Sequence, residues 1–305
     1  MTFIPASDIG SPDTSKGRHR KRQSLPPWFK VQLQPGPHYK ELRQLTQSHQ
    51  LHTICEEARC PNLWECWNNR TATFLILGDI CTRRCHYCSV RTARPLELDR
   101  EEPHRVADAV RTLNLRHAVI TSVNRDDVPD GGAAVFAETI AHIRTVHPTC
   151  TIEVLIPDFQ GHQEDLATVI NEHPDILNHN IETVPRLFPS IRPQGKYSRS
   201  LKILQWAQEM GARTKSGLMA GLGETEEEIR NVMYDLRTVG CEMLTLGQYL
   251  RPTLEHIPVS RFYTPEEFEE LKLEALTLGF HHVESGPLVR SSYHAEQQAF
   301  EANVP

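Results

Sequence analysis

The sequence has no apolar run of about 18 residues, so it offers no membrane-spanning helix. Its N-terminus also lacks the apolar stretch of a secretory signal. Basic residues are not in excess, since 33 Lys and Arg stand against 39 Asp and Glu, a formal charge of −6. A general nucleic-acid-binding surface is therefore not expected. With 39% hydrophobic and 24% charged residues, the 305-residue chain has the composition of a soluble globular protein, and we expect it to be cytoplasmic.

Acidic residues are scarce at the N-terminus. The first 30 residues contain six Lys and Arg but only two acids, Asp8 and Asp13. We interpret residues 1–26 as a flexible basic arm, because a polar segment rich in Ser, Pro and basic residues buries too little apolar surface to fold. A short organellar transit peptide is the alternative, since such peptides are also basic and poor in acids.

Cysteine is sparse over most of the chain. Of the eight cysteines, six lie between Cys55 and Cys88, whereas Cys150 and Cys241 are isolated. A disulfide framework is typical of short secreted chains, and this chain is neither short nor visibly secreted. The clustered cysteines therefore indicate metal binding, and the two isolated ones are predicted to be small buried hydrophobes.

From residue 73 onward, predicted strands alternate with predicted helices. Strands that recur every few tens of residues, each followed by a helix, predict a parallel sheet or barrel. Six such units are two short of a full eightfold barrel, so the expected fold class is α/β, a partial (β/α)6 TIM-like barrel with N-terminal and C-terminal extensions. The predicted strands are 73–77, 118–122, 151–156, 175–180, 213–217 and 243–246, and the predicted helices are 104–113, 133–146, 164–171, 200–210, 225–239 and 265–278.

The expected domain boundaries follow from this pattern. The arm covers residues 1–26, and an N-terminal extension with the first cysteines covers 27–72. The barrel covers 73–280, and a C-terminal tail covers 281–305.

The strongest local signal is the C-x3-C-x2-C spacing of Cys81, Cys85 and Cys88. It follows the first predicted strand, so in a strand–helix barrel it lies at the carboxyl end, where active sites are found. Three thiolates can hold three irons of a 4Fe–4S cube and leave the fourth iron open. Structural zinc normally takes four protein ligands. A zinc site completed by His86 or another residue is the alternative.

A second triplet lies just upstream, where Cys55, Cys60 and Cys66 have the spacing C-x4-C-x5-C. Three more soft thiolates so close to the first set predict a second cluster. The C-x-x-C spacing of redox pairs is absent from this triplet. A disulfide between two of these cysteines is the alternative interpretation.

The C-x3-C-x2-C loop resembles that of the radical S-adenosylmethionine superfamily, in which the open iron binds S-adenosylmethionine and one electron releases a 5′-deoxyadenosyl radical. Within that superfamily the chain resembles the lipoyl synthase family from about Trp28 to Ala295. The segments that carry the resemblance are 51–58, 60–62, 65–67, 71–74, 121–127, 178–183, 214–219, 247–252 and 289–295.

This resemblance implies a sulfurtransferase that uses two 4Fe–4S clusters and S-adenosyl-L-methionine. Two sulfur atoms would be inserted at carbons six and eight of a protein-bound octanoyl-lysine, with sulfur taken from the auxiliary cluster. The family holds that cluster with three cysteines and a serine, which here match Cys55, Cys60, Cys66 and Ser292. The radical cluster matches Cys81, Cys85 and Cys88. The implied cofactor contacts are Tyr87, Thr121, Ser122, Asn180 and Glu182, and no catalytic residue beyond the cluster ligands is implied.

The implied partners are octanoylated carrier domains, such as 2-oxoacid dehydrogenase E2 and the glycine cleavage H protein, and a low-potential electron donor, ferredoxin or flavodoxin. No nucleic-acid or membrane partner is expected. Arg91 and Arg94, just after the cluster loop, are candidates for docking an acidic carrier. Two alternatives remain open: a sulfur inserter like biotin synthase, which lacks the upstream triplet, and a non-catalytic iron–sulfur carrier, which would not cleave S-adenosylmethionine.

Overall fold

The computed structural model describes residues 24–30, 36–58 and 60–301. The predicted basic arm, residues 1–26, lies outside the described residues except for its last three. In the part of the chain that the structure describes, none of the helices has the length and apolar character needed to cross a membrane.

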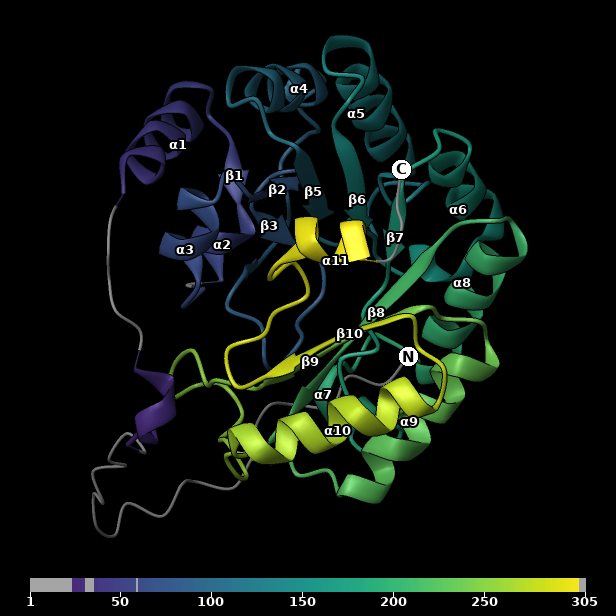
Figure 1. Cartoon of the computed structure of the whole chain (residues 1–305). Helices are drawn as coiled ribbons and strands as arrows, with labels where there is room; N and C mark the ends of the chain where they lie inside the picture. Colours follow the sequence, from purple (N-terminus) through teal and green to yellow (C-terminus); the bar gives the residue numbers. More distant parts are fainter. Residues whose placement is uncertain (1–23, 31–35, 59, 302–305) are drawn as a thin grey trace, which may run out of the picture.

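One curved sheet forms the centre of the molecule, and its strands line the inner wall of an incomplete barrel (Figure 1). The strand order is β1-β2-β5-β6-β7-β8-β9-β10. All neighbours from β2 to β10 pair in parallel, and only β1 runs antiparallel, against β2. The strands are β1 (His52–Thr53), β2 (Ala72–Ile76), β5 (His117–Ser122), β6 (Thr151–Leu155), β7 (Ile176–Asn178), β8 (Thr214–Ala220), β9 (Met243–Gln248) and β10 (His282–Gly286).

Helices follow the parallel strands and cover the outer face of the sheet (Figure 1). Two of them begin at a complete capping box, with Thr225 before α9 and Thr264 before α10. The covering helices are α4 (Glu102–Thr112), α5 (Ala133–Val146), α6 (Gln163–Ile170), α8 (Tyr197–Glu209), α9 (Glu226–Thr238) and α10 (Pro265–Thr277). The remaining helical segments are η1 (Pro27–Phe29), α1 (Pro37–Ser48), α2 (Ile54–Glu57), α3 (Leu63–Asn68), η2 (Phe159–Gly161), α7 (Phe188–Ile191) and α11 (Ala295–Glu301).

The partial-barrel prediction is confirmed, and each of the six predicted strand–helix units is present. The structure adds a seventh parallel strand, β10, which pairs with β9 over its full length. We had assigned these residues to the C-terminal tail, because His282, Glu284 and Gly286 give the segment little strand character. Backbone pairing with a neighbouring strand outweighs that weak local preference.

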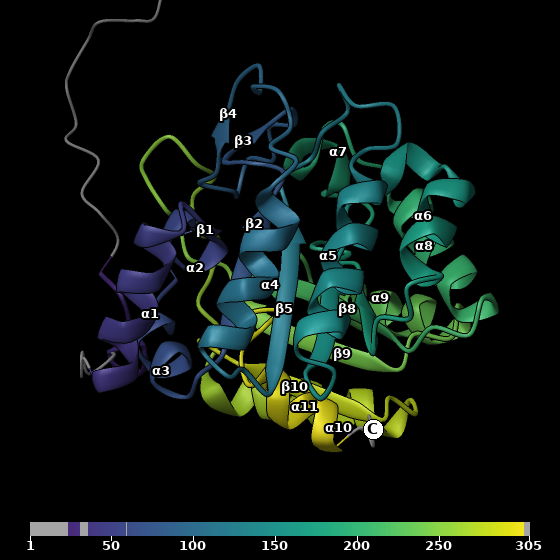
Figure 2. The same ribbon diagram turned by 90° about the horizontal axis from the view of Figure 1, so that it is seen from above.

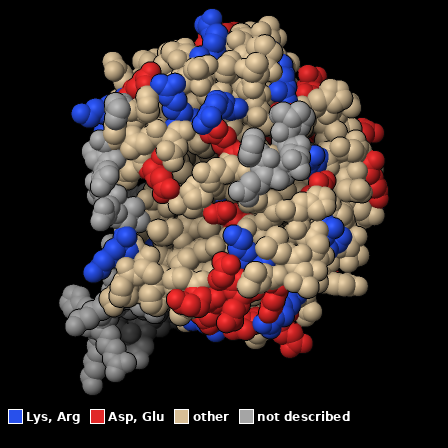
Figure 3. All heavy atoms as spheres, viewed as in Figure 1, with Lys and Arg blue, Asp and Glu red and all other residues tan. Residues whose placement is uncertain are grey.

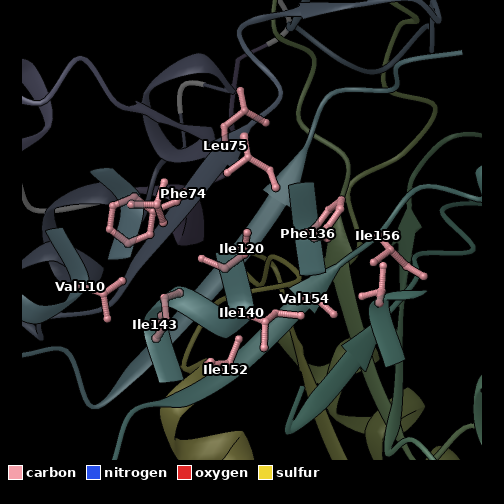
Figure 4. Packing of buried hydrophobic residues seen from close by; sticks show 14 of the residues in the cluster. Phe74, Leu75, Val110, Ile120, Phe136, Ile140, Ile143, Ile152, Val154 and Ile156 are labelled. Carbon is pink, nitrogen blue, oxygen red and sulfur yellow. The ribbon is translucent and has the colours of Figure 1, made fainter. Parts of the chain in front are cut away.

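The core lies between the sheet and its helices. Buried side chains of β2, β5 and β6 form one cluster with those of α4 and α5, which includes Ile120, Val154, Phe136 and Ile140 (Figure 4). Strands that carry such continuous apolar runs are typical of parallel sheets covered on both faces. The isolated cysteines, Cys150 and Cys241, are buried as predicted.

The two ends of the barrel carry different elements. A small two-stranded sheet, β3 (Ile80–Cys81) with β4 (Arg91–Thr92), lies beyond the carboxyl end of β2 (Figure 2). At the amino ends of the strands, Ala299 of α11 packs against Ile176 and Met243. The C-terminal segment therefore runs from the carboxyl end of β10 to the opposite end of the barrel.

Candidate active site

A cavity of about 1330 Å³ lies at the carboxyl ends of the parallel strands. Its wall includes Thr73 of β2, Thr121 of β5 and Gly217 of β8. The loop after β2 and the segment after β10 complete the wall. Because loops from several strands converge at this end of a barrel, the cavity is the first candidate for a functional site.

The loop after β2 carries the C-x3-C-x2-C triplet, and its first residues turn the chain sharply. Leu77 and Gly78 have φ angles of 69° and 85°, in the left-handed region. The Glu102 carboxylate accepts a hydrogen bond from the Leu77 amide at 2.6 Å, which holds this turn against the start of α4. Cys81, Cys85 and Cys88 all line the cavity.

Arg83, which lies inside this triplet, fixes the loop to the barrel. Its guanidinium donates to both carboxylate oxygens of Asp126, at 2.6 and 2.7 Å, and its Nη2 lies 2.7 Å from Asp158. Both Arg83 and Asp158 are buried, and the hydrogen bond from Arg83 holds the pKa of Asp158 well below its usual range despite burial. The Cys81 thiol accepts from the amides of Arg83 and Asn124 at 3.4 Å.

The upstream triplet lies outside the barrel, on two short helices and the segment between them, which carries Cys60. Cys55 is in α2, whose first turn is capped by Thr53, and Cys66 is in α3. The Cys60 amide donates to the Cys55 carbonyl at 2.9 Å, and the Cys66 amide donates to the Asn62 carbonyl at 3.0 Å. The three cysteines are too widely spaced to lie on one turn of a single helix. These backbone turns bring them into one small region.

The electrostatic interactions among the thiols fall into two groups that match the triplets. Cys55 and Cys60 raise the pKa of Cys66, and Cys85 and Cys81 raise the pKa of Cys88. Burial raises the pKa of Cys55 and of Cys88 to about 12, and it also raises the pKa of Cys60, Cys66 and Cys85. These five thiols are therefore protonated at neutral pH, and metal binding must release protons.

Among the described residues, no three Cys, His, Asp or Glu side chains converge as the ligands of one metal ion do. In a 4Fe–4S cluster each thiolate binds a different iron, so the ligands stand farther apart than around one ion. Cys55 and Cys60 line the main cavity, whereas Cys66 lines a neighbouring cavity of about 340 Å³.

The C-terminal segment meets the N-terminal extension, as expected from the resemblance. The Thr73 hydroxyl donates to Ser292 Oγ at 2.8 Å, and Thr73 also interacts with the Cys55 thiol. The Asn62 side chain donates to the Leu288 carbonyl at 2.6 Å. Ser292 thus lies at the cavity wall, one hydrogen-bonded residue away from the upstream triplet.

Two of the predicted cofactor contacts, Tyr87 and Glu182, line the cavity as hydrogen-bonded neighbours. Burial raises the pKa of both groups, and Tyr87 donates a hydrogen bond to Glu182. Glu182 has a φ of 68°, which turns the chain just after β7. Asn180 donates to Glu182 at 3.2 Å and to Ser291 Oγ at 2.7 Å, while its Oδ1 is buried and has no hydrogen-bond partner among the described residues. An unpaired acceptor in a cavity wall is available to a ligand.

The other two predicted contacts, Thr121 and Ser122, lie at the end of β5 and also line the cavity. They differ in what they can offer to a ligand. Thr121 Oγ1 donates to the Leu155 carbonyl at 3.0 Å, so its proton is already used. Ser122 Oγ is buried without a hydrogen-bond partner in the described part of the chain, so it can bond to a ligand.

Sequence reasoning missed two arginines in the cavity wall. Arg192 donates to the Asn180 carbonyl at 2.9 Å, and its charge acts on Cys85 and Glu182. Arg290 and Cys60 both line the cavity, and the charge of Arg290 acts against the rise that burial causes in the pKa of Cys60. Neither arginine stands in a recognisable spacing with a cysteine, so only the fold reveals the pairing.

Known proteins resemble this chain over most of its length. The profile of the Radical SAM superfamily matches residues 75–236, and that of the N-terminal domain of lipoyl synthase matches residues 10–60. A lipoyl synthase from Rubrobacter xylanophilus is 59% identical over 93% of this chain and 89% of its own length. One from Symbiobacterium thermophilum is 57% identical over 91% and 87%, and one from Chlorobaculum tepidum is 54% identical over 90% and 95%.

Solved structures are similar in fold only. Methylornithine synthase superimposes with a TM-score of 0.50 at 14% identity, covering 83% of this chain and 82% of that chain. Streptococcus suis SuiB bound to the precursor peptide SuiA superimposes with a TM-score of 0.55 at 9% identity, covering 81% and 52%. The partial barrel is therefore shared well beyond the sequences that are closely similar.

Proposed function

This chain belongs to the lipoyl synthase family of radical S-adenosylmethionine enzymes, and we propose from its own residues how it carries out that family's reaction. The reaction is the insertion of two sulfur atoms at carbons six and eight of a protein-bound octanoyl-lysine, which forms the lipoyl cofactor. We assign a distinct part of this reaction to each cysteine triplet.

Cys81, Cys85 and Cys88 are proposed to hold the radical cluster, and Cys55, Cys60, Cys66 and Ser292 the auxiliary cluster. When bound, the first cluster supplies the electron that cleaves S-adenosylmethionine and the second supplies the inserted sulfur. The donor set fits, because soft thiolates suit iron–sulfur clusters and a harder serine oxygen binds less strongly to a soft site. Five of the six thiols and Ser292 line one cavity.

The residues of the cavity wall bind and orient the cofactor. Ser122 Oγ and Asn180 Oδ1 are buried polar atoms without partners in the described structure, so a ligand gains by bonding to them. The Arg192 cation beside Glu182 and Cys85 provides an anion site at the same wall, suited to a carboxylate. Tyr87 supplies an aromatic ring next to the cluster loop. The Thr121 hydroxyl already donates to the Leu155 carbonyl, so Thr121 contributes to the shape of the cavity rather than a free donor.

The substrate is proposed to reach the cavity on a carrier domain. A tethered chain has a high local concentration and needs only a narrow entrance, which shields a radical from water. Arg84 and Arg94 are exposed close to the cluster loop, and Arg84 lines the cavity. Arg91 is a weaker candidate, because it forms an ion pair with Asp79 at 3.0 Å.

An acidic carrier would not dock on every face. Acidic side chains gather at the lower edge of the molecule, where α10 lies (Figure 3). Glu266, Glu269 and Glu270 of α10 are exposed there. Repulsion at that face and attraction near Arg84 and Arg94 favour approach from the cluster loop. Octanoylated 2-oxoacid dehydrogenase E2 and glycine cleavage H protein, with ferredoxin or flavodoxin as reductant, are the proposed partners.

The observation that best supports the two-cluster proposal is the hydrogen bond from Thr73 to Ser292, which brings the C-terminal segment to the upstream triplet at the cavity. The test is the iron and sulfide content after anaerobic reconstitution. Two 4Fe–4S clusters predict about eight irons and eight sulfides per chain. About four irons and four sulfides per chain would contradict the proposal that a second cluster donates the sulfur. Product formation from an octanoylated carrier domain, compared with free octanoic acid, tests the tethered substrate separately.

A further inference from the structure

The loop that follows β9 closes one side of the cavity. Residues 249–258 (the β9 loop) have no regular secondary structure, and all of them except Thr253 line the cavity. Most of these side chains are apolar, and Leu254 remains 48% exposed. The apolar residues of the loop that line the cavity are Leu250, Pro252, Leu254, Ile257 and Pro258. An alkyl chain that enters the cavity gains free energy by burial against such a wall.

Side chains of the β9 loop fold it onto itself. Arg251 Nε donates to the His256 carbonyl at 2.8 Å, and Arg251 Nη2 donates to the Leu254 carbonyl. The Tyr249 hydroxyl donates to the Ile257 carbonyl at 2.8 Å. The loop is therefore one folded unit, and its place in the cavity wall depends on its contacts with other segments.

The His256 ring joins this unit to the C-x3-C-x2-C loop. His256 Nε2 lies 2.9 Å from the Cys88 carbonyl oxygen, and His256 Nδ1 lies 2.9 Å from Thr253 Oγ1. A carbonyl oxygen only accepts, so Nε2 carries the ring proton and Nδ1 accepts from the Thr253 hydroxyl. Thr253 Oγ1 in turn accepts from the Glu255 amide at 3.3 Å. Both ring nitrogens are thus bonded, and the ring is held in one orientation.

A second, longer hydrogen bond joins the same two loops. The Ile257 amide donates to the His86 carbonyl at 3.4 Å. The apolar wall is therefore attached to the backbone of the C-x3-C-x2-C loop at His86 and at Cys88. The bond to Cys88 is the shorter of the two and the only one of them that a side-chain substitution can remove.

We propose that His256 is a positioning residue, which fixes the apolar β9 loop to Cys88 and so sets where the octanoyl chain lies relative to the radical cluster. This inference rests on the proposed function, because it takes Cys88 as a ligand of that cluster and an octanoyl chain as the substrate. The wall that holds the chain cannot move away from the C-x3-C-x2-C loop unless this link breaks. Abstraction of hydrogen requires the reacting atoms to lie within a narrow range of distances.

Loss of the link should separate cleavage of S-adenosylmethionine from sulfur insertion. Cleavage depends on the cluster and its cofactor, whereas insertion also needs the chain to be held in place. Cleavage beside a misplaced chain yields 5′-deoxyadenosine without product. A net hydrogen bond corresponds to about a fivefold change in an equilibrium constant. The ratio of 5′-deoxyadenosine to lipoyl product should therefore rise by about that factor.

The experiment uses three substitutions of His256 in the full-length chain. His256→Phe keeps a planar ring and removes both hydrogen bonds. His256→Gln places an amide donor near the position of Nε2, so it retains the bond to Cys88. His256→Asn places its amide near the position of Nδ1, so it reaches Thr253 and not Cys88.

Two measurements follow the link. Hydrogen–deuterium exchange of the cluster-free chain reports on residues 84–92 and 249–258. The reconstituted chain, given an octanoylated 2-oxoacid dehydrogenase E2 domain, gives the ratio of 5′-deoxyadenosine to lipoyl product. We expect faster exchange in both segments and a higher ratio for His256→Phe and His256→Asn, with His256→Gln close to the parent chain.

The matched control is His147→Phe. His147 Nε2 lies 2.9 Å from the Leu115 carbonyl oxygen, and neither residue is part of the cavity wall. This substitution removes a ring-to-carbonyl bond of the same length from another part of the barrel. Exchange in residues 84–92 and 249–258, and the product ratio, should remain at the parent values.

An unchanged ratio in a folded, loaded His256→Phe chain would overturn the positioning role, even with faster exchange, because the link would then be structural only. Equal effects of His256→Gln and His256→Phe would also overturn it, since the bond to Cys88 would not be the cause. A parent chain that releases no 5′-deoxyadenosine after reconstitution would instead contradict the proposed function.

Discussion

The two cysteine triplets are held in place by different kinds of contact. The C-x3-C-x2-C triplet lies on one loop, where carboxylates of the first part of the barrel, Glu102, Asp126 and Asp158, hold its first half. Its last cysteine, Cys88, is held through its carbonyl by the His256 ring at 2.9 Å, from the segment after β9. The upstream triplet lies on two short helices and the segment between them, and it depends on contacts with the distant C-terminal segment. The hydrogen bond from Asn62 to Leu288 spans 226 positions. One site is thus part of the barrel, and the other is completed only when both ends of the chain meet, so each can be perturbed separately.

The largest expected effect comes from removing one ligand in each triplet. Cys85→Ala should abolish both cleavage of S-adenosylmethionine and product formation, because the open-iron cluster loses a ligand. Cys60→Ala should abolish sulfur insertion and spare cleavage. Chromatography of 5′-deoxyadenosine and of the lipoylated product measures the two activities. Equal loss of cleavage in both variants would contradict the separation of the two sites.

Arg83→Met tests the support of the first triplet alone. It leaves the buried Asp158 carboxylate without its closest cation, which typically costs about 3–5 kcal/mol of folding free energy. Urea unfolding of the cluster-free chain measures this loss. The control is Arg91→Met, which breaks an exposed ion pair worth about 1 kcal/mol or less. Similar losses in the two variants would show that Arg83 does not hold the loop.

Moderately acidic pH should lower the free energy of unfolding of the barrel, because of the buried His179. This buried ring lies 2.9 Å from Ser200 Oγ, and burial lowers its pKa to about 4. The unfolded chain takes up the proton near pH 6.5, so stability is complete above that pH and falls as the pH drops toward 4. The loss is on the order of 1–3 kcal/mol. His179→Asn should flatten this part of the pH profile of urea unfolding, and an unaltered slope would exclude His179 as its source.

The smallest expected effect concerns the upstream triplet. Thr73→Val removes the hydrogen bond to Ser292, which is worth about 1 kcal/mol. Iron loss from the auxiliary cluster to a chelator should become faster, because Ser292 loses its nearest support. Thr121→Val, on the adjacent strand, removes a hydroxyl that donates to the Leu155 carbonyl, away from Ser292, and it should leave auxiliary iron retention unchanged. Equal rates of iron loss in the two variants would exclude this hydrogen bond as a support.

Local patterns predicted most of the barrel and both triplets. Strands such as β2 and β5 carry apolar runs, and cysteine spacing is visible in the sequence itself. The α5 helix was predicted with the bounds that the structure has, Ala133–Val146. These features depend on neighbours in sequence, so no knowledge of the fold is needed to recognise them.

Features that depend on distant contacts were not visible. β10 has weak strand character and forms because β9 pairs with it. Arg192 and Arg290 stand in no motif with the cysteines that they influence, and Cys66 gave no sign that it would line a separate cavity. Ser292 was recognised only through the resemblance, because a serine pair near a C-terminus has no chemical signature of its own.

The central claim is that two clusters share one cavity, with the second completed by the C-terminal segment. An anaerobic crystal structure of the reconstituted chain tests it most directly. We predict one 4Fe–4S cluster on Cys81, Cys85 and Cys88, and another bound by Cys55, Cys60, Cys66 and the Ser292 hydroxyl oxygen. A fully loaded structure in which Ser292 Oγ is not bonded to iron, or in which the upstream triplet carries no cluster, would contradict the account.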